Sequence, residues 1–134
     1  MPELKKFQSQ ITFIYLPEMQ PAVDFFEGIL GLEMMDDQGW AKIYRTGADS
    51  YIGAVSGEKA FKHYQEESAV LITLCVNDVP GWYEYLKSKG VKILREMQDR
   101  PDNQVRCFFF EGPGGYSFEI QEFLNPEIAR IFHK

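Results

Sequence analysis

The sequence predicts an α+β fold in which a β-α-β-β-β unit occurs twice and a short C-terminal helix follows. Two helical patterns give the first signal, because the same spacing separates Pro21 from Pro80 near their starts and Gly31 from Gly90 at their ends. The second signal is that one strand-like run precedes each helix and three follow it. A repeat at such a long period indicates two modules that bury their apolar faces together. We therefore expect a curved mixed sheet around a cavity.

The repeat sets the expected boundaries within a single domain that spans residues 1–134. Module one should cover about 1–56, a polar linker 57–68, module two about 69–124 and the C-terminal helix 125–134. The linker is rich in Glu and Lys, and a short helix is expected around residues 58–64. The strand-like runs cover, in chain order, residues 7–16, 32–36, 40–45, 50–55, 69–76, 91–96, 105–111 and 116–123.

Each helix of the two modules is predicted from an apolar stripe that lies between a start signal and a stop signal. Asp78 or Asn77 is the expected N-cap of the second helix, and glycine ends both helices in the position of a left-handed C-cap. The stripes recur at helical spacing. They consist of Ala22, Phe26, Ile29 and Leu30 in the first helix and of Val79, Trp82, Tyr83 and Leu86 in the second.

Alternation along the first strand of each module assigns the two faces of its sheet. Side chains under a helix should be apolar, and these are Ile14 and Leu16 in module one and Ile72, Leu74 and Val76 in module two. The opposite face of each sheet then lines the expected cavity. Its first-strand residues are Ile11, Phe13 and Tyr15 in module one and Leu71, Thr73 and Cys75 in module two.

Composition limits the kinds of partner. The chain of 134 residues has a net charge of -6, is 45% hydrophobic and contains no basic run, so we expect no nucleic-acid binding. No apolar run approaches the roughly 20 residues of a membrane span, and residues 1–6 lack the apolar core of a secretion signal. We expect a cytoplasmic protein whose partners are small molecules and proteins. Cys75 and Cys107 are not closely spaced, and we expect buried, reduced thiols.

Three segments stand out along the chain, namely residues 22–26 with Leu30-Gly31-Leu32, the turn at 76–79, and the run 111–120 that contains Gly112-Pro113-Gly114. In this order they resemble the glyoxalase, bleomycin-resistance and extradiol-dioxygenase superfamily, whose fold is also called vicinal oxygen chelate. The resemblance implies a small-molecule cavity and a homodimer. In metal-using members it also implies a divalent ion that is held by residues of the first, fourth, fifth and eighth strands.

The positions that correspond to those metal ligands carry few donor atoms in this chain. They fall at Ile11, near Gly53, at Leu71 and at Glu119, and only Glu119 supplies a ligand. Zinc or iron needs three or four N, O or S donors, so we expect no bound cofactor, with a divalent metal as the alternative. Two additions to the donor set are open. A β-bulge would turn Gln10 inward, and His63 with Glu66 and Glu67 has the spacing of a helical site.

The expected site is an aromatic wall with a few polar groups, which is typical of a small-molecule pocket. The candidate ligand-binding residues are Phe13, Tyr15, Tyr51, Thr73, Arg106, Ser117, Glu119 and Gln121, with Trp40, Tyr44 and Phe109 dependent on strand register. Glu119 is also the candidate catalytic residue, as a general base for proton abstraction next to a carbonyl. Alternatively, Glu119 is structural and pairs with Arg106 or Arg45, or accepts a hydrogen bond from Tyr15 or Tyr51.

Two functions follow from this expected site. The first is metal-free binding or sequestration of an aromatic or planar ligand. The alternative is a metal-dependent lyase or isomerase of the glyoxalase type, or a dioxygenase, that uses Glu119. Whether the chain is an enzyme is open at this point, and a purely structural or regulatory role would require a filled cavity.

Overall fold

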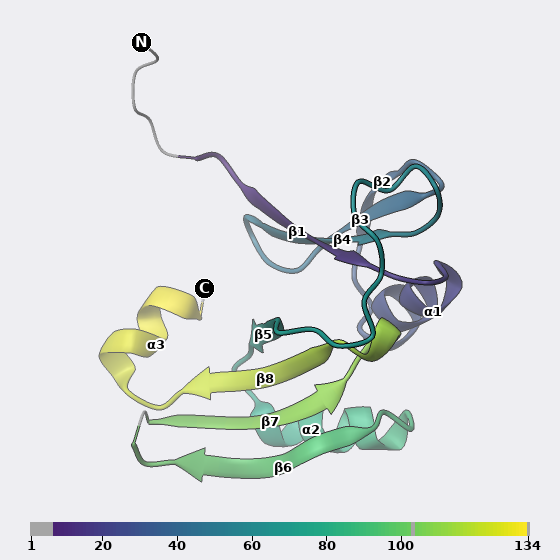
Figure 1. Ribbon diagram of the computed structural model, residues 1–134. Helices are drawn as coiled ribbons and strands as arrows, with labels where there is room; N and C mark the ends of the chain where they lie inside the picture. Colours follow the sequence, from purple (N-terminus) through teal and green to yellow (C-terminus); the bar gives the residue numbers. More distant parts are fainter. Residues whose placement is uncertain (1–6, 103, 134) are drawn as a thin grey trace. The chain divides into compact units, whose positions relative to one another are not determined.

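The computed structural model describes residues 7–102 and 104–133, which form two compact units on either side of the junction between Tyr64 and Gln65 (Figure 1). The expectation for residues 1–6 lies outside this range. None of the helices within it combines the length and the apolar character that a membrane span requires. Each unit has its own sheet and its own helix layer, and the two are described separately below.

The first unit contains one mixed four-stranded sheet. Its elements are β1 (Gln10–Tyr15), α1 (Gln20–Val23), the π-helical turn η1 (Asp24–Ile29), β2 (Met34–Asp37), β3 (Ala41–Arg45) and β4 (Ser50–Val55). The strand order is β1-β4-β3-β2, in which β1 and β4 are parallel and the other pairs are antiparallel. This is the predicted β-α-β-β-β unit.

The second unit repeats that topology and adds two short helices. Its elements are β5 (Leu71–Cys75), α2 (Val79–Ser88), β6 (Ile93–Arg100), β7 (Val105–Glu111), the 3-10 turn η2 (Pro113–Gly115), β8 (Ser117–Phe123) and α3 (Pro126–Phe132). The strand order is β5-β8-β7-β6, again with the first and last strands parallel. The prediction of an α+β fold with two tandem β-α-β-β-β modules and a C-terminal helix is confirmed.

The apolar core of the first unit lies between its sheet and the helix formed by α1 and η1. Ile14 and Leu16 are buried, as predicted, and the ring of Phe26 lies 5.3 Å from that of Tyr44. The Tyr44 hydroxyl donates a 2.7 Å hydrogen bond to Glu27 in the π-helical turn. The ring of Tyr44 is therefore buried while its hydroxyl keeps a hydrogen-bond partner. Tyr44 therefore belongs to the core of this unit.

The core of the second unit lies between α2 and the other sheet. Tyr83 of α2 packs edge-on against Phe108 of β7, with 4.9 Å between ring centroids. Ile72 and Leu74 of β5 lie on the same face as predicted but are only half-buried, because β5 is the edge strand. The fully buried residues of this core are Val79, Leu86, Phe108, Phe110, Phe118 and Ile120.

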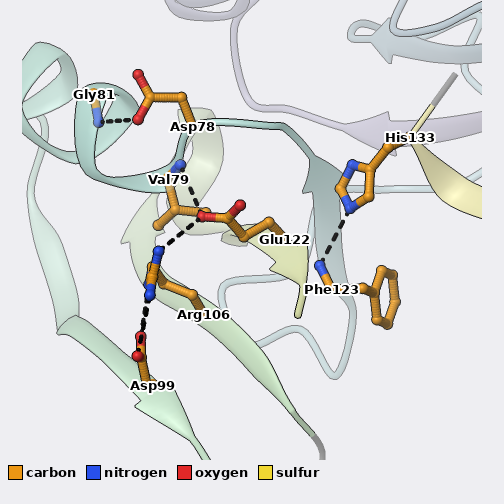
Figure 2. A network of polar contacts seen from close by, with 8 residues as sticks. All are labelled: Asp78, Val79, Gly81, Asp99, Arg106, Glu122, Phe123 and His133. Carbon is orange, nitrogen blue, oxygen red and sulfur yellow. Dashed lines mark hydrogen bonds and ion pairs between the residues drawn. The ribbon is translucent and has the colours of Figure 1, made fainter. Parts of the chain in front are cut away.

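A chain of polar contacts fastens the N-terminal end of α2 to its sheet (Figure 2). Asp78 caps the helix, since its side chain accepts a 3.0 Å hydrogen bond from the Gly81 N–H. Glu122 of β8 accepts a long bond of 3.5 Å from the Val79 N–H and an equally long one from Arg106. Arg106 in turn makes a bidentate ion pair with Asp99, with N–O distances of 2.7 and 3.2 Å. Hydrogen bonding from Arg106 lowers the pKa of the Asp99 carboxyl.

Two expected features of secondary structure differ in the structure. Residues 58–64 contain turns and bends but no helix, and the side chain of Phe61, which a helical stripe would bury, is 87% exposed. Strand β6 extends to Arg100, beyond the apolar run that ends near residue 96, because an edge strand with polar side chains is held by its ladder to β7.

Replacing Asp78 with alanine should destabilise the protein by about 1 kcal/mol, because it removes the N-cap of α2. Asn77→Ala is the matched control, since the neighbouring Asn77 was the other N-cap candidate and is exposed. Urea unfolding monitored by circular dichroism measures both variants. Equal losses of stability in the two variants would contradict the assignment of the cap to Asp78.

Candidate functional site

Glu119 is a buried carboxylate in the middle of the second sheet. Its side chain is 7% exposed and lies on the face away from α2, whereas its neighbours Phe118 and Ile120 point into the core beneath that helix. The Thr73 hydroxyl of β5 donates a 2.7 Å hydrogen bond to Glu119 Oε1. Among the residues that the structure describes, no Lys or Arg forms an ion pair with this carboxylate. The structural alternative of pairing with Arg106 or Arg45 is therefore not what holds Glu119 in place.

Strand register places Glu119 within a row of four side chains that crosses the whole sheet. Thr73 of β5 lies opposite Glu119, Glu119 lies opposite Phe109 of β7, and Phe109 lies opposite Arg95 of β6. Directly opposed residues of adjacent strands share a face and are in contact distance. The Arg95 guanidinium carbon lies 4.7 Å from the centroid of the Phe109 ring. The row therefore presents a hydroxyl, a carboxylate, an aromatic ring and a guanidinium in that order.

The next row along the same face carries both cysteines. Cys75, Gln121 and Cys107 lie opposite one another on β5, β8 and β7. The pKa of the Cys107 thiol is raised to about 11, mainly by burial and then by its hydrogen bond to Glu119. The pKa of the Cys75 thiol is also raised, mainly by burial and then by the charge of Glu119. Both thiols are free, but Cys75 is exposed and not buried as expected. A raised pKa keeps each sulfur protonated near neutral pH, where a thiol is a weak nucleophile.

The second sheet brings together four of the predicted site residues, namely Thr73, Ser117, Glu119 and Gln121. The prediction that Arg106 shares their face was wrong. Arg106 lies opposite Glu122, on the face that α2 covers, and belongs to the polar contacts of that helix (Figure 2). Phe109 occupies the face of Glu119 instead, since positions 106 and 109 point to opposite sides of β7.

The aromatic residues of the predicted site lie on the first sheet. Ile11, Phe13 and Tyr15 of β1 lie opposite Tyr51, Gly53 and Val55 of β4, on the face away from the helix. The Phe13 ring rests on Gly53, where an added Cβ atom would come within 2.3 Å of a ring carbon. Phe13 is nevertheless 42% exposed. Tyr44 is on the helix face and does not belong to this group.

A small pocket in the first unit also contains Tyr15. Its volume is about 180 Å³, and residues of the predicted linker form much of its wall. No sequence pattern predicted this pocket, because much of its wall comes from a linker that the structure folds into turns and bends. The lining residues are Tyr15, Leu16, Val55, Ser56, Gly57, Ala60, Lys62, His63 and Tyr64.

Helix α3 packs on the same face of the second sheet as Glu119. Phe123, at the end of β8, lies opposite Val105 on that face, and its ring stacks on Phe132 of α3 with 4.7 Å between centroids. The His133 side chain accepts a 3.2 Å hydrogen bond from the Phe123 N–H (Figure 2). The sheet thus carries α2 on one face and α3 on the other (Figure 1). The C-terminal helix was predicted, but its position over this face was not.

The positions that the family resemblance assigns to metal ligands carry too few donor atoms for a divalent metal in this chain. Ile11, Gly53 and Leu71 supply no ligand, and within residues 7–102 and 104–133 no three His, Cys, Asp or Glu side chains converge as a metal site would require. Gln10 does not rescue the site, because β1 and β4 pair in unbroken register and the Gln10 amide bonds to Thr12. His63, Glu66 and Glu67, whose spacing left a helical metal site open, are not helical in the structure.

Comparison with known proteins supports one family. Residues 8–120 match the family model of the glyoxalase/bleomycin resistance protein/dioxygenase superfamily. The chain is 26% identical over 117 residues to the uncharacterised protein YraH of Bacillus subtilis, covering 80% of this chain and 91% of that one. It is 30% identical over 121 residues to a manganese-dependent 2,3-dihydroxybiphenyl 1,2-dioxygenase of Geobacillus genomosp. 3, covering 88% of this chain but only 36% of that longer protein.

A solved structure agrees with this assignment at the level of the fold. The crystal structure of a glyoxalase/bleomycin resistance protein/dioxygenase from Nocardioides superposes with a TM-score of 0.73 at 16% identity, covering 92% of this chain and 87% of that one. Since the family model spans most of the sequence, the chain belongs to the glyoxalase/bleomycin resistance protein/dioxygenase superfamily.

Proposed function

We propose that this protein binds a small planar organic molecule on the face of the second sheet around Glu119 and holds it with side chains alone. The observation that carries this proposal is the buried Glu119 carboxylate, fixed by Thr73 at 2.7 Å and placed opposite the ring of Phe109. The carboxylate supplies a directional acceptor and the ring supplies apolar contact, which together are what a small-molecule site needs.

The surroundings of Glu119 leave its charge uncompensated. Its neighbours Thr73 and Cys107 are neutral donors, and a buried charge without an opposite charge or full hydrogen bonding is costly. A structural role would favour full compensation in the unliganded protein. A charged N–H donor of a ligand would give the carboxylate a stronger hydrogen bond than either neutral neighbour supplies.

The first sheet carries aromatic surface of its own. Phe13, Tyr15 and Tyr51 lie on the face away from its helix. We propose that these rings contact a planar ligand, and that Ser117 and Gln121 contact a ligand beside Glu119 on the second sheet. In this proposal the protein is a cytoplasmic homodimer, with sequestration or transport of the ligand as its role.

A metal-dependent enzyme is the second candidate. The observation that favours it is the position of Glu119 on the last strand, where metal-using members of the family have a ligand, together with the similarity to a manganese-dependent dioxygenase. Such a lyase, isomerase or dioxygenase would use Glu119 as a ligand or as a general base. The donor set around Glu119 does not fit a metal, and this is why we rank metal-free binding first.

Glu119→Gln should weaken ligand binding about tenfold or more while leaving the free energy of unfolding unchanged or raised by up to about 1 kcal/mol. Glutamine keeps the size of the side chain and the acceptor for Thr73 but removes the buried charge. Binding is measured by screening a library of planar aromatic fragments through the amide resonances of Thr73, Phe109 and Gln121, and stability by urea unfolding.

Glu84→Gln is the matched control, because Glu84 is an exposed residue of α2 on the other side of the sheet. This control should change neither fragment binding nor stability. A Glu119→Gln variant that binds fragments like the wild type but is clearly less stable would mean that Glu119 is structural, and the proposed function would then be wrong.

Protein purified after expression in medium supplemented with manganese, iron, nickel and zinc should contain well below one equivalent of any of them. The physical reason is the absence of a third converging donor in the described residues. Inductively coupled plasma mass spectrometry of the wild type and of Glu119→Gln measures this. One equivalent of metal in the wild type that disappears in the variant would favour the second candidate.

A further inference from the structure

The position of Arg95 in the row with Glu119 results from two irregularities of β6. The register between β6 and β7 shifts once between Ile93 and Arg95 and again between Arg95 and Gln98. At each shift β6 contains one residue more than β7. A β-bulge of this kind re-aims side chains, and bulges are common next to active sites.

The two bulges decide which charge lies beside Phe109. An unbroken ladder continued from Gln98 would set Glu96 opposite Phe109, and one continued from Ile93 would set Leu94 there. With both bulges in place, Arg95 occupies the position and its guanidinium stacks over the ring. The irregular strand thus presents a cation, where a regular one would present an acid or an alkyl group.

Arg95 and Glu119 carry opposite charges that do not neutralise each other. They are two strands apart on one face, so their Cα atoms are separated by roughly 10 Å, with the Phe109 ring between them. Neither forms an ion pair with any other residue in the part of the chain that the structure describes. By contrast, Arg45 also stacks over an aromatic ring but reaches Glu33 and the Ala48 carbonyl.

Arg100 strengthens the positive end of this face. It lies opposite Val105, on the same side of the sheet, and its guanidinium is 3.6 Å from Asp102. Both Arg95 and Arg100 lower the pKa of the Cys107 thiol, against the larger effects of burial and of Glu119. Arg95 and Arg100 thus place two guanidinium groups at the β6 edge of this face, which also carries Glu111 opposite Ser117.

We infer that the ligand of this face is a planar zwitterion, whose anionic group pairs with Arg95 and whose ammonium or amine group donates to Glu119. The planar body between the two groups lies along the Phe109 ring and the stacked guanidinium. A guanidinium presents paired N–H donors that suit a carboxylate, and its flat face accepts a ring. This inference rests on the proposed function and specifies the chemical class of the ligand.

The test uses three probes of similar size and shape, titrated by isothermal calorimetry at low salt. 4-(Aminomethyl)benzoate carries both charges, 4-(aminomethyl)benzamide lacks the anion and 4-methylbenzoate lacks the cation. The zwitterion should bind the wild type about tenfold more tightly than either of the other two, since each charge-assisted bond is worth about that much.

Arg95→Gln should weaken binding of the zwitterion about tenfold and leave the affinity for the benzamide unchanged. Arg95→Lys should restore part of the loss because the charge is retained without the flat, forked donor. Lys87→Gln is the matched control: Lys87 also lies over an aromatic ring, that of Tyr83, at 4.7 Å, but on α2 and so on the other face. Thermal unfolding of each variant checks that it is folded.

Equal affinities of Arg95→Gln and Lys87→Gln for the zwitterion would overturn the inference, as would failure of the zwitterion to bind the wild type. The proposed function is judged separately. If planar fragments still bind in a manner that depends on Glu119, the site exists but does not select a zwitterion. If they do not, the proposed function is wrong as well.

Discussion

The parallel pairing of β5 with β8 is the constraint on which the rest of the second unit depends. It brings the first and last strands of the unit together and makes β8 a central strand between β5 and β7. Because α2 connects β5 to the far edge and covers one face, the alternate residues of β8 must lie either in the core or on the opposite face. Glu119 is thereby held at the middle of a sheet, where both neighbouring strands restrict its access to water.

Two glutamates of β8 show how the surroundings assign a role to the same side chain. Glu122 lies on the helix face, pairs with Arg106 and accepts from the N-terminal end of α2, so its charge is compensated within the fold. Glu119, three residues earlier and on the other face, has neutral donors in Thr73 and Cys107. The first arrangement fastens a helix to its sheet. The second leaves the buried carboxylate with neutral partners alone.

Alternation predicted the faces of residues whose strands are regular, and it failed where the pattern is ambiguous. Thr73, Glu119 and Gln121 were assigned correctly because β5 and β8 pair without interruption. Strand β7, with the sequence VRCFFFE, has apolar residues on both faces, so its sequence does not show whether Arg106 or Phe109 accompanies Glu119. The contact of α3 with Phe123 is a tertiary contact without a periodic signal.

The duplicated modules help to separate what belongs to the fold from what belongs to the site. In the first unit Gly53 pairs with Phe13 and Ile43 in the same way that Glu119 pairs with Thr73 and Phe109 in the second. The same topological position therefore holds an acid in one unit and, in the other, a glycine covered by an aromatic ring.

The β-bulges of the two edge strands, β2 and β6, also differ between the two units. Strand β2 has one irregularity, between Met34 and Asp36, at the place where β6 has its first, between Ile93 and Arg95. This shared bulge is a property of the module. The second bulge, between Arg95 and Gln98, falls where the shorter strand β2 ends at Asp37. It therefore belongs to the longer edge strand of the second unit, where it sets Arg95 beside Phe109 on the same side as Glu119.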